Sequence, residues 1–222
     1  MRRPSATSRA TSCESTGSSA RTGGRTFLLV AVLLSSFLAS TAVRADEGAP
    51  RVTVLIAYHS GSGHTEKMAK GVADGVESLP GAHALLRRVE QVTADELFAS
   101  DALILGSPVY WSNMAAEVKT FIDNWQFKFG VWPDLKLKNK VGAAFTTGGQ
   151  VSGGKELTML SILAAMLGNQ MIVVSGGGAF GASATTEGTS PGIDEQELSS
   201  ARELGRRVAD VAAKLAAPAH AP

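Results

Sequence analysis

The stretch YHSGSGHTEKM, residues 58–68, decides the fold. An aliphatic run at residues 52–57 precedes it and ends abruptly at polar residues, as a buried strand of a parallel sheet does. After it, four apolar residues recur at helical spacing and form one stripe: Met68, Val72, Val76 and Leu79. The stretch is therefore a strand-to-helix turn at the carboxyl edge of a sheet, where open α/β folds bind ligands.

The composition of this turn favours a phosphate-binding loop. A helix N-terminus presents free backbone N–H groups and the positive end of the helix dipole, and both favour anions. Gly61 and Gly63 let the backbone approach a ligand closely. The turn also offers three hydroxyl groups, those of Ser60, Ser62 and Thr65. Because residues 57–66 contain no Lys or Arg, neutral donors and the dipole would hold the phosphate.

Other interpretations of the turn differ in plausibility. A Walker A loop is excluded because no Lys follows either glycine in the required register. The dinucleotide fingerprint G-x-G-x-x-G begins at Gly61 and Gly63 but has Glu66 in its third glycine position, and Glu90 could serve as its ribose-binding acid. A plain turn in which Ser62 or Thr65 caps the helix also stays open.

The composition is that of one globular domain with an unusual first segment. The chain has 222 residues, of which 44% are hydrophobic and 18% charged, enough for one well-buried core. Residues 1–45 hold six of the 21 basic and one of the 20 acidic residues, which leaves 15 basic and 19 acidic residues beyond them. That mild acidity, without a basic stripe, argues against a nucleic-acid partner.

Residues 1–45 resemble a secretory signal peptide. An apolar segment at 27–39 follows an Arg/Ser/Thr-rich stretch and precedes Val43-Arg44-Ala45, a small-x-small cleavage pattern. Cleavage after Ala45 predicts an exported domain at 46–217, followed by a disordered tail at 218–222. The mature chain would contain no membrane span. It would also contain no thiol, because the only cysteine, Cys13, lies in the leader. An uncleaved membrane anchor and an organelle transit peptide remain as alternatives.

From residue 51 onward strand-like and helix-like segments alternate, which predicts an α/β fold with a parallel sheet covered on both faces. We expect strands at 52–58, 84–90, 102–106, 141–146 and 171–175. Helices are expected at 65–79, 94–99, 114–125, 155–167 and 194–215. The Gly/Ser/Thr-rich segment 176–193 is expected to be a long loop of the kind that is usually functional.

Two further strand-end loops are suited to a flat ring. Residues 107–114 contain Pro108 and the adjacent aromatic residues Tyr110 and Trp111, whose faces can pack against a planar ligand. Residues 146–154 are glycine-rich, so their backbone N–H groups can reach the heteroatoms of such a ring. We therefore expect three loops to meet at one edge of the sheet.

These three loops resemble the FMN site of flavodoxin-like proteins. Residues 60–65, SGSGHT, fit the Ser/Thr-x-Ser/Thr-Gly-x-Thr phosphate loop of that superfamily at every position. Within it the chain looks most like the WrbA-type NAD(P)H:quinone oxidoreductases. The similar features are Gly106-Ser107-Pro108 with Asn113-Met114, the 146–156 loop with its Gly153-Gly154 pair, and FGASATTEG at 180–188.

The resemblance implies a flavodoxin-like three-layer sandwich whose five-stranded parallel sheet has the order 2-1-3-4-5. By position, it assigns the FMN phosphate to Ser60, Ser62, Gly63, His64 and Thr65. It assigns the isoalloxazine ring to Pro108, Val109, Tyr110, Trp111 and Asn113. It assigns the other edge of the ring and the ribityl chain to Thr146, Thr147, Gly148, Gly149 and Gln150. No metal and no obligatory catalytic side chain is implied.

The implied activity is the transfer of two electrons from NAD(P)H through FMN to a quinone or similar small acceptor. The resemblance also implies a homo-dimer or tetramer. Two alternatives keep the same cofactor. One is a flavodoxin-type electron carrier reduced by a protein partner, and the other is a flavin-storage or sensing module without turnover.

Overall fold

The computed structural model describes residues 52–186 and 192–217. The chain divides between Ala45 and Asp46 into two units, and all described residues belong to the second. The predicted leader, the predicted tail and part of the predicted loop at 176–193 lie outside the described residues.

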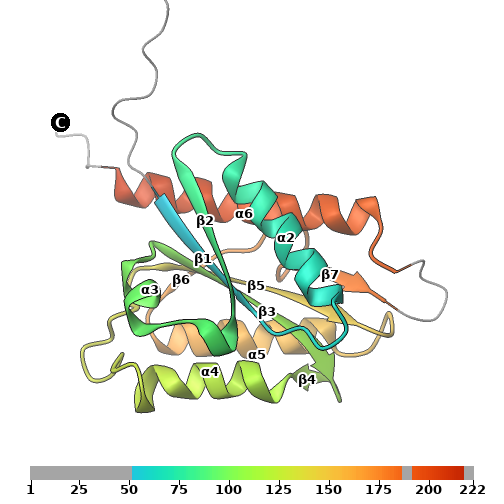
Figure 1. Ribbon diagram of the computed structural model, residues 1–222, viewed down its shortest axis with the longest axis horizontal. Coiled ribbons are helices and arrows are strands. Elements are labelled where there is room, and N and C mark those ends of the chain that lie inside the picture. Colours follow the sequence, from blue (N-terminus) through green and yellow to red (C-terminus); the bar gives the residue numbers. More distant parts are fainter. Residues whose placement is uncertain (1–51, 187–191, 218–222) are drawn as a thin grey trace, which may run out of the picture. The chain divides into compact units, whose positions relative to one another are not determined.

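A parallel sheet forms the middle layer of the domain (Figure 1). Its strands lie in the order β2 (Ala82–Arg88), β1 (Val52–Tyr58), β3 (Ala102–Tyr110), β5 (Val141–Gly148) and β6 (Ile172–Val173). The predicted three-layer fold is confirmed, and two unpredicted strands change its detail. Strand β4 (Asn113–Met114) pairs antiparallel with β3, and β7 (Ala182–Thr185) pairs parallel with β5.

Helices cover both faces of the sheet. In Figure 1, α2 (His64–Glu77) and α6 (Glu195–Ala216) lie on one side of it. On the other side lie α4 (Ala116–Phe127) and α5 (Lys155–Gly168), while the 3₁₀ turn η1 (Val89–Gln91) and α3 (Ala94–Ala99) link β2 to β3. Within residues 52–186 and 192–217, no helix combines the length and apolarity needed to cross a bilayer.

Strand β1 shows why the sheet is buried between two helix layers. Successive side chains of a strand point to opposite faces. Val54 and Ile56 accordingly pack in a core with residues of α2 and α6, whereas Leu55 and Ala57 pack in a second core with residues of α3, α4 and α5. All four side chains are fully buried, so the continuous aliphatic run was the correct signal for a central parallel strand.

Several predicted boundaries differ from the structure: β5 extends to Gly148 and not 146, β6 covers only Ile172–Val173 and not 171–175, and α4 runs over Ala116–Phe127 and not 114–125. Strand β2 runs over 82–88, not 84–90, because Gly81 (φ +82°) makes the turn into it and Ala82 pairs with Val52. The predicted loop at 107–114 is a hairpin, since β3 continues to Tyr110 and pairs with β4. Within the predicted loop at 176–193, residues 182–185 form β7, because the free side of β5 beyond β6 accepts a second short strand.

Close contact between α2 and α6 depends on two glycines. A Cβ atom on Gly205 would lie 2.0 Å from the carbonyl oxygen of Val72, and one on Gly75 would lie 2.0 Å from that of Arg202. Each glycine therefore allows the backbone of the facing helix to approach. This close packing also fixes the position of α2, which begins within the 58–68 turn.

We expect Gly205→Ala to lower the free energy of unfolding by about 1–3 kcal/mol, because the added methyl group separates the two helices. Urea denaturation measures this loss. Gly168→Ala in α5 is the matched control: its Cβ would meet nothing within 4 Å, so the same change should leave stability equal or raise it. A Gly205→Ala variant as stable as the unchanged protein would contradict the packing of α2 against α6.

Candidate functional site

A cavity of about 640 Å³ lies at the carboxyl edge of the sheet. This volume falls within the usual range for small-molecule sites, about 300–1,000 Å³. Its walls come from the 58–68 turn, the β3–β4 hairpin, the loop after β5 and the residue that follows β7. The lining residues are Ser62, His64, Pro108, Val109, Tyr110, Trp111, Ser112, Thr147, Gly148, Gly149, Gln150, Ser152, Gly153 and Thr186.

The 58–68 turn leads directly into α2 without a conventional side-chain cap. Gly63 is the N-cap residue and has φ +91°, a left-handed conformation that favours glycine. The hydroxyl of Ser60 accepts hydrogen bonds from the amides of Gly63 and Glu66, at 3.1 and 3.2 Å, and so holds the turn closed. The interpretation that Ser62 or Thr65 caps the helix is wrong, because the hydroxyl of Ser62 pairs with His64 and that of Thr65 with Thr147.

The N-terminus of α2 keeps free backbone donors. The N–H groups of Ser62, His64 and Thr65 donate to no acceptor among the described residues. Ser62 and His64 line the cavity, and their side chains are linked at 3.0 Å between Oγ and Nδ1. Free amides and the positive end of a helix dipole at one end of a cavity form an anion site, so a phosphate group fits here.

Five predicted site residues do not line the cavity. Ser60 and Thr65 are buried and their hydroxyls are engaged within the protein. Thr146 is buried and does not line the cavity, and its hydroxyl has no partner among the described residues. Gly63 shapes the turn, and Asn113 lies in β4, where its Oδ1 accepts from the amide of Met114. The other ten predicted residues line the cavity.

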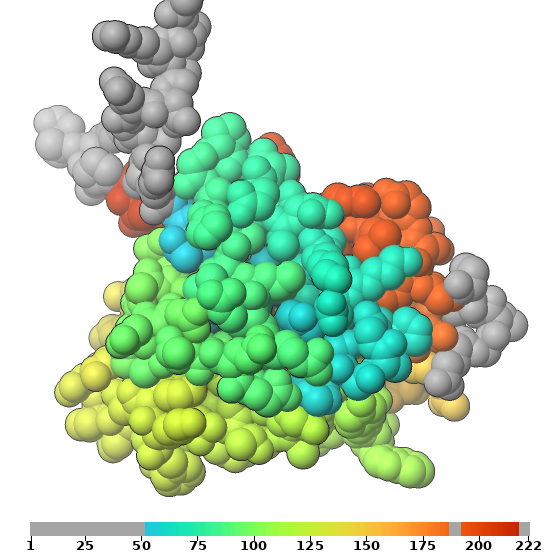
Figure 2. All heavy atoms as spheres, in the orientation of Figure 1, coloured from blue at the N-terminus to red at the C-terminus, as the bar shows by residue number. Residues whose placement is uncertain are grey.

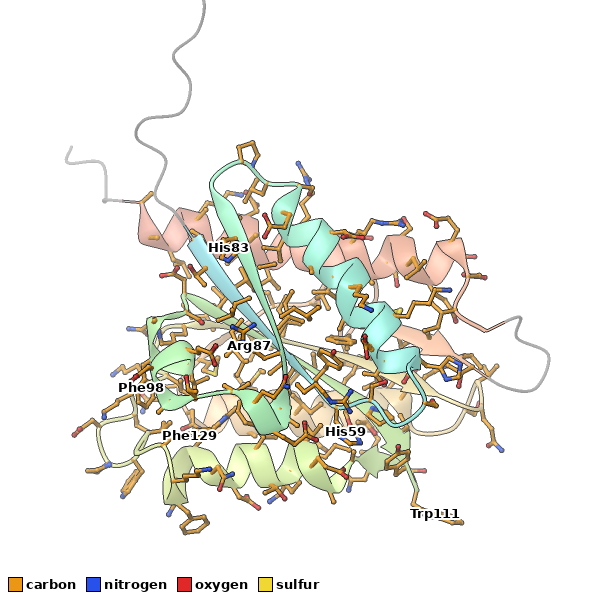
Figure 3. All side chains as sticks on the ribbon, viewed as in Figure 1. His59, His83, Arg87, Phe98, Trp111 and Phe129 are labelled. Atoms are coloured by element: carbon orange, nitrogen blue, oxygen red, sulfur yellow. The ribbon has the colours of Figure 1, made fainter. Side chains whose placement is uncertain are left out.

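The β3–β4 hairpin forms an aromatic wall. Trp111 (φ +52°) and Ser112 (φ +60°) make its two-residue turn in the left-handed region, which is strained for residues with a side chain. Trp111 is 100% exposed, and Figure 3 shows it projecting away from the body of the protein. In Figure 2 the same hairpin, yellow-green, protrudes at the lower right. Tyr110 lies behind this tip, and its hydroxyl is 2.9 Å from the point where a Cβ on Gly61 would be.

The end of β5 and the loop after it form the opposite wall and are tied to their neighbours. Thr147 bonds to Thr65 of α2 at 2.8 Å between the two hydroxyls, and the amide of Thr186 donates to the Gly148 carbonyl at 2.9 Å. Gly154, the N-cap residue of α5, has φ +96°, and a Cβ there would lie 2.7 Å from Cα of Ser112. The backbone of the hairpin turn at Ser112 therefore packs closely against the backbone at Gly154, just before α5.

The sequence interpretation missed four lining residues: Ser112, Ser152, Gly153 and Thr186. Ser112 lies between two residues that were predicted, and Ser152 and Gly153 lie in the glycine-rich loop that was noted, so proximity in sequence was an available signal. Thr186 follows β7, and the sequence showed no signal for that strand.

A buried histidine lies at the base of the 58–68 turn (Figure 3). His59 Nδ1 is 3.0 Å from a carboxylate oxygen of Glu90, and its Nε2 is 3.6 Å from one of Glu117. Arg88 Nη2 donates to the Ser60 carbonyl at 2.8 Å, and Nε of the same side chain lies 3.9 Å from a carboxylate oxygen of Glu90. Glu90 thus holds the turn from below and does not line the cavity, so the dinucleotide interpretation loses its ribose-binding acid.

We expect acid to destabilise the domain partly through Glu90. Burial raises the pKa of this carboxyl, but the hydrogen bond to His59 and the charge of Arg88 together hold the pKa below its ordinary value of 4.5. A lowered carboxyl pKa contributes stability that is present above pH 4.5 and lost as pH falls through the folded-state pKa. Urea denaturation at a series of pH values should show that the free energy of unfolding falls less steeply with decreasing pH in Glu90→Gln than in the unchanged protein.

Part of that acid sensitivity should survive in Glu90→Gln. The hydrogen bond from the amide of Thr93 to Glu96 lowers the pKa of Glu96 as well, so this second carboxyl keeps its own contribution. An unchanged slope in Glu90→Gln would show that the contact between His59 and Glu90 adds nothing to stability.

Comparison with known protein families adds a match over part of the chain. Residues 89–186 match the family described as NADPH-dependent FMN reductase. That range includes the β3–β4 hairpin and the loop after β5 but not the 58–68 turn.

Curated relatives match over nearly their whole length. The chain is 32% identical over 204 residues to an NAD(P)H dehydrogenase (quinone) of Geobacter sulfurreducens, covering 74% of this chain and 99% of the relative. It is 34% identical to NAD(P)H dehydrogenase (quinone) 3 of Rhizobium meliloti, covering 73% of this chain and 92% of the relative.

Solved structures show the same fold. A WrbA-like flavodoxin structure from Agrobacterium tumefaciens has a TM-score of 0.63 at 30% identity and covers 73% of this chain and 98% of its own. A flavodoxin from the domain Archaea, with a TM-score of 0.58 at 23% identity, covers 72% of this chain and 99% of its own.

Proposed function

The chain belongs to the NAD(P)H dehydrogenase (quinone) family, and from that premise we propose that it is an FMN-dependent enzyme that transfers two electrons from NAD(P)H to a quinone. The observation that carries the proposal is the cavity at the sheet edge. At one end it has the free amides of a helix N-terminus, and its walls are an aromatic hairpin and a glycine-rich loop.

The residues present fit FMN. We assign its phosphate to the amides of Ser62, His64 and Thr65, where a helix dipole and neutral donors replace a cationic side chain. Ser60 and Gly63 act indirectly in this assignment, because they hold the turn in the shape that aims these amides. FMN, when bound, supplies the chemistry by accepting a hydride from the nicotinamide and passing two electrons to the quinone.

The two walls orient the ring. Tyr110, which is 47% exposed, and Trp111 offer flat faces to a planar ligand. Pro108 and Val109 precede them in β3 and set the direction of the strand that leads to the two aromatic residues. Across the cavity, Thr147, Gly148, Gly149 and Gln150 present backbone groups to the edge of the ring and the ribityl chain. Thr146 and Asn113 support the two walls. Backbone N–H groups aimed at the ring stabilise negative charge that develops on it.

Anaerobic half-reactions test the proposal. Purified protein loaded with FMN is expected to lose its flavin absorbance when NADH or NADPH is added and to regain it when a soluble benzoquinone follows. FMN that stays oxidised with both nicotinamides, yet is reduced by an electron-transfer protein, would instead support a flavodoxin-type carrier. Bound FMN that no donor reduces would support a storage role.

We further propose that the enzyme is a homo-oligomer. Helix α5 is apolar around much of its circumference, and Leu157, Leu160 and Leu167 remain exposed along it at helical spacing. Trp111 adds a fully exposed aromatic side chain beside the cavity. Exposed apolar stripes of this kind mark interaction surfaces, and a second copy of the chain is the occupant that the family resemblance favours.

Sedimentation velocity is expected to show a dimer or tetramer, and Leu160→Glu is expected to shift it toward monomer by placing a charge in the apolar contact. Leu215→Glu, the same change at an exposed leucine of α6, should leave the assembly intact. Monomeric unchanged protein, or equal assembly of both variants, would contradict a contact through α5.

Residues 1–45 are proposed to be a cleaved export signal. The sequence pattern supports this, because the apolar segment at 27–39 precedes the small-x-small pattern Val43-Arg44-Ala45. N-terminal sequencing of the protein purified from its native host should begin at Asp46. A chain that keeps Met1 in the membrane fraction would favour the anchor, and one recovered from an organelle would favour the transit peptide.

A further inference from the structure

Lys155, the first residue of α5, is buried beside the cavity. Only 5% of its surface is exposed, and its Nζ donates to the hydroxyl of Thr185 at the end of β7. Its stem packs against the last residue of β5, with Cγ 3.1 Å from the point where a Cβ on Gly148 would be. Cγ2 of Val109 lies 3.5 Å from the same point.

Among residues 52–186 and 192–217, no carboxylate forms an ion pair with this lysine. Glu197 accepts from the amide of Thr185 at 2.7 Å but makes no ion pair with Lys155. A buried ammonium group is costly without a counter-charge, and a cation in the first turn of a helix also opposes the helix dipole. The cost of burying the ammonium group and the repulsion by the helix dipole therefore both act on one residue next to a ligand cavity.

A bound anionic group would offset both the burial cost and the repulsion by the helix dipole. FMN can carry negative charge at two places, its phosphate and its reduced ring. Its phosphate already has a site at the N-terminus of α2, where no cation is needed. The stem of Lys155 instead packs against Gly148 and near Val109, two residues assigned above to the ring. Of the two charges, the one that the ring gains when it accepts electrons therefore lies beside the residues that the Lys155 stem contacts.

We propose that the ammonium group of Lys155 selectively stabilises the reduced state of the bound cofactor and so raises its two-electron reduction potential. This inference rests on the proposed function and deepens it, because it names a side chain that sets how easily the site takes electrons from NAD(P)H. Lys155 acts through its electric field and its fixed position under Gly148, without acting as a proton donor. Thr185 holds the ammonium group in place.

Redox titration of the FMN-loaded protein with a reference dye tests the inference. In Lys155→Met, which keeps the length of the stem and removes the charge, we expect the reduction equilibrium constant to fall at least tenfold. For a two-electron couple this is a potential about 30 mV more negative. The dissociation constant of oxidised FMN, followed by quenching of flavin fluorescence, should change much less, because the phosphate site is untouched.

Two variants control for folding and for net charge. Lys155→Arg keeps the charge and is expected to restore the potential. Lys119→Met removes an exposed lysine of α4 that pairs with Asp123, and it should leave the potential unchanged. Thermal unfolding without FMN is expected to show Lys155→Met folded and no less stable than the unchanged protein, since the variant removes a buried charge that has no ion-pair partner among the described residues.

The outcomes separate this inference from the proposed function. FMN bound to Lys155→Met with an unchanged potential would overturn the inference and leave the function intact. Equal weakening of oxidised and reduced FMN would overturn it too, because the lysine would then serve the phosphate or the fold. Failure of the unchanged protein to bind FMN would overturn both.

Discussion

Ser62→Glu is expected to weaken FMN binding by about 100-fold or more. Ser62 lies at the N-terminus of α2, is exposed and lines the cavity where we place the phosphate. Two like charges about 4 Å apart repel by about 4 kcal/mol at the dielectric of a protein surface, and 100-fold corresponds to about 2.8 kcal/mol. Fluorescence quenching of FMN on titration with protein measures the loss.

The same substitution should not harm the fold. A carboxylate beside a helix N-terminus favours the helix, so the protein without FMN is expected to unfold at an equal or higher temperature. Ser62→Gln adds a similar volume without charge and is expected to bind FMN within a few-fold of the unchanged protein. Equal affinities of the Glu and Gln variants would show that no phosphate sits at this turn. Thr65→Glu is a poorer test, because Thr65 is buried and bonded to Thr147.

Gly154→Ala is expected to lower the free energy of unfolding by about 2–4 kcal/mol and to impair FMN binding as well. At φ +96° an alanine is strained, and its Cβ would lie 2.7 Å from Cα of Ser112, which is backbone and cannot rotate away. The hairpin that carries Tyr110 and Trp111 would have to shift outward. Urea denaturation and FMN titration of the same variant measure the two effects.

Gly153→Ala is the matched control next to it. A Cβ at Gly153 would meet Gln150 at 3.4 Å, an ordinary contact. This variant is expected to change stability by less than about 0.5 kcal/mol. If Gly154→Ala behaved like Gly153→Ala, the hairpin turn would not pack against the start of α5 as described.

The architecture was predictable because its signals are local. Strand β1 is a continuous aliphatic run buried on both faces, and α2 carries its buried residues at helical spacing. Helix α6 has Asp194 as its N-cap: the Asp194 carboxylate accepts from the amide of Glu197 and the Glu197 carboxylate accepts in return from the amide of Asp194, at the acidic helix start that the sequence shows. The position of the cavity followed from the rule that ligands bind at the carboxyl edge of such sheets.

The roles of individual side chains were harder to predict, because they depend on contacts distant in sequence. The hydroxyl of Thr65 bonds to that of Thr147, 82 residues away, so only the amide of Thr65 is left for the proposed phosphate site. Strand β7 has only four residues, and it forms because β5 has an unpaired side that begins where β6 ends. In the sequence, Lys155 looks like an ordinary surface residue at the start of a helix. Only the fold shows that Gly148 and Thr185 of β7 lie against it and that it is buried.

A crystal structure of the protein with FMN tests the central claim most directly. We expect the phosphate at the amides of Ser62, His64 and Thr65, with the ring between Tyr110 and the backbone of Gly148 and Gly149. Flavin density elsewhere on the protein, or a phosphate that avoids the N-terminus of α2, would contradict the assignment of the 58–68 turn as the phosphate site of a quinone reductase.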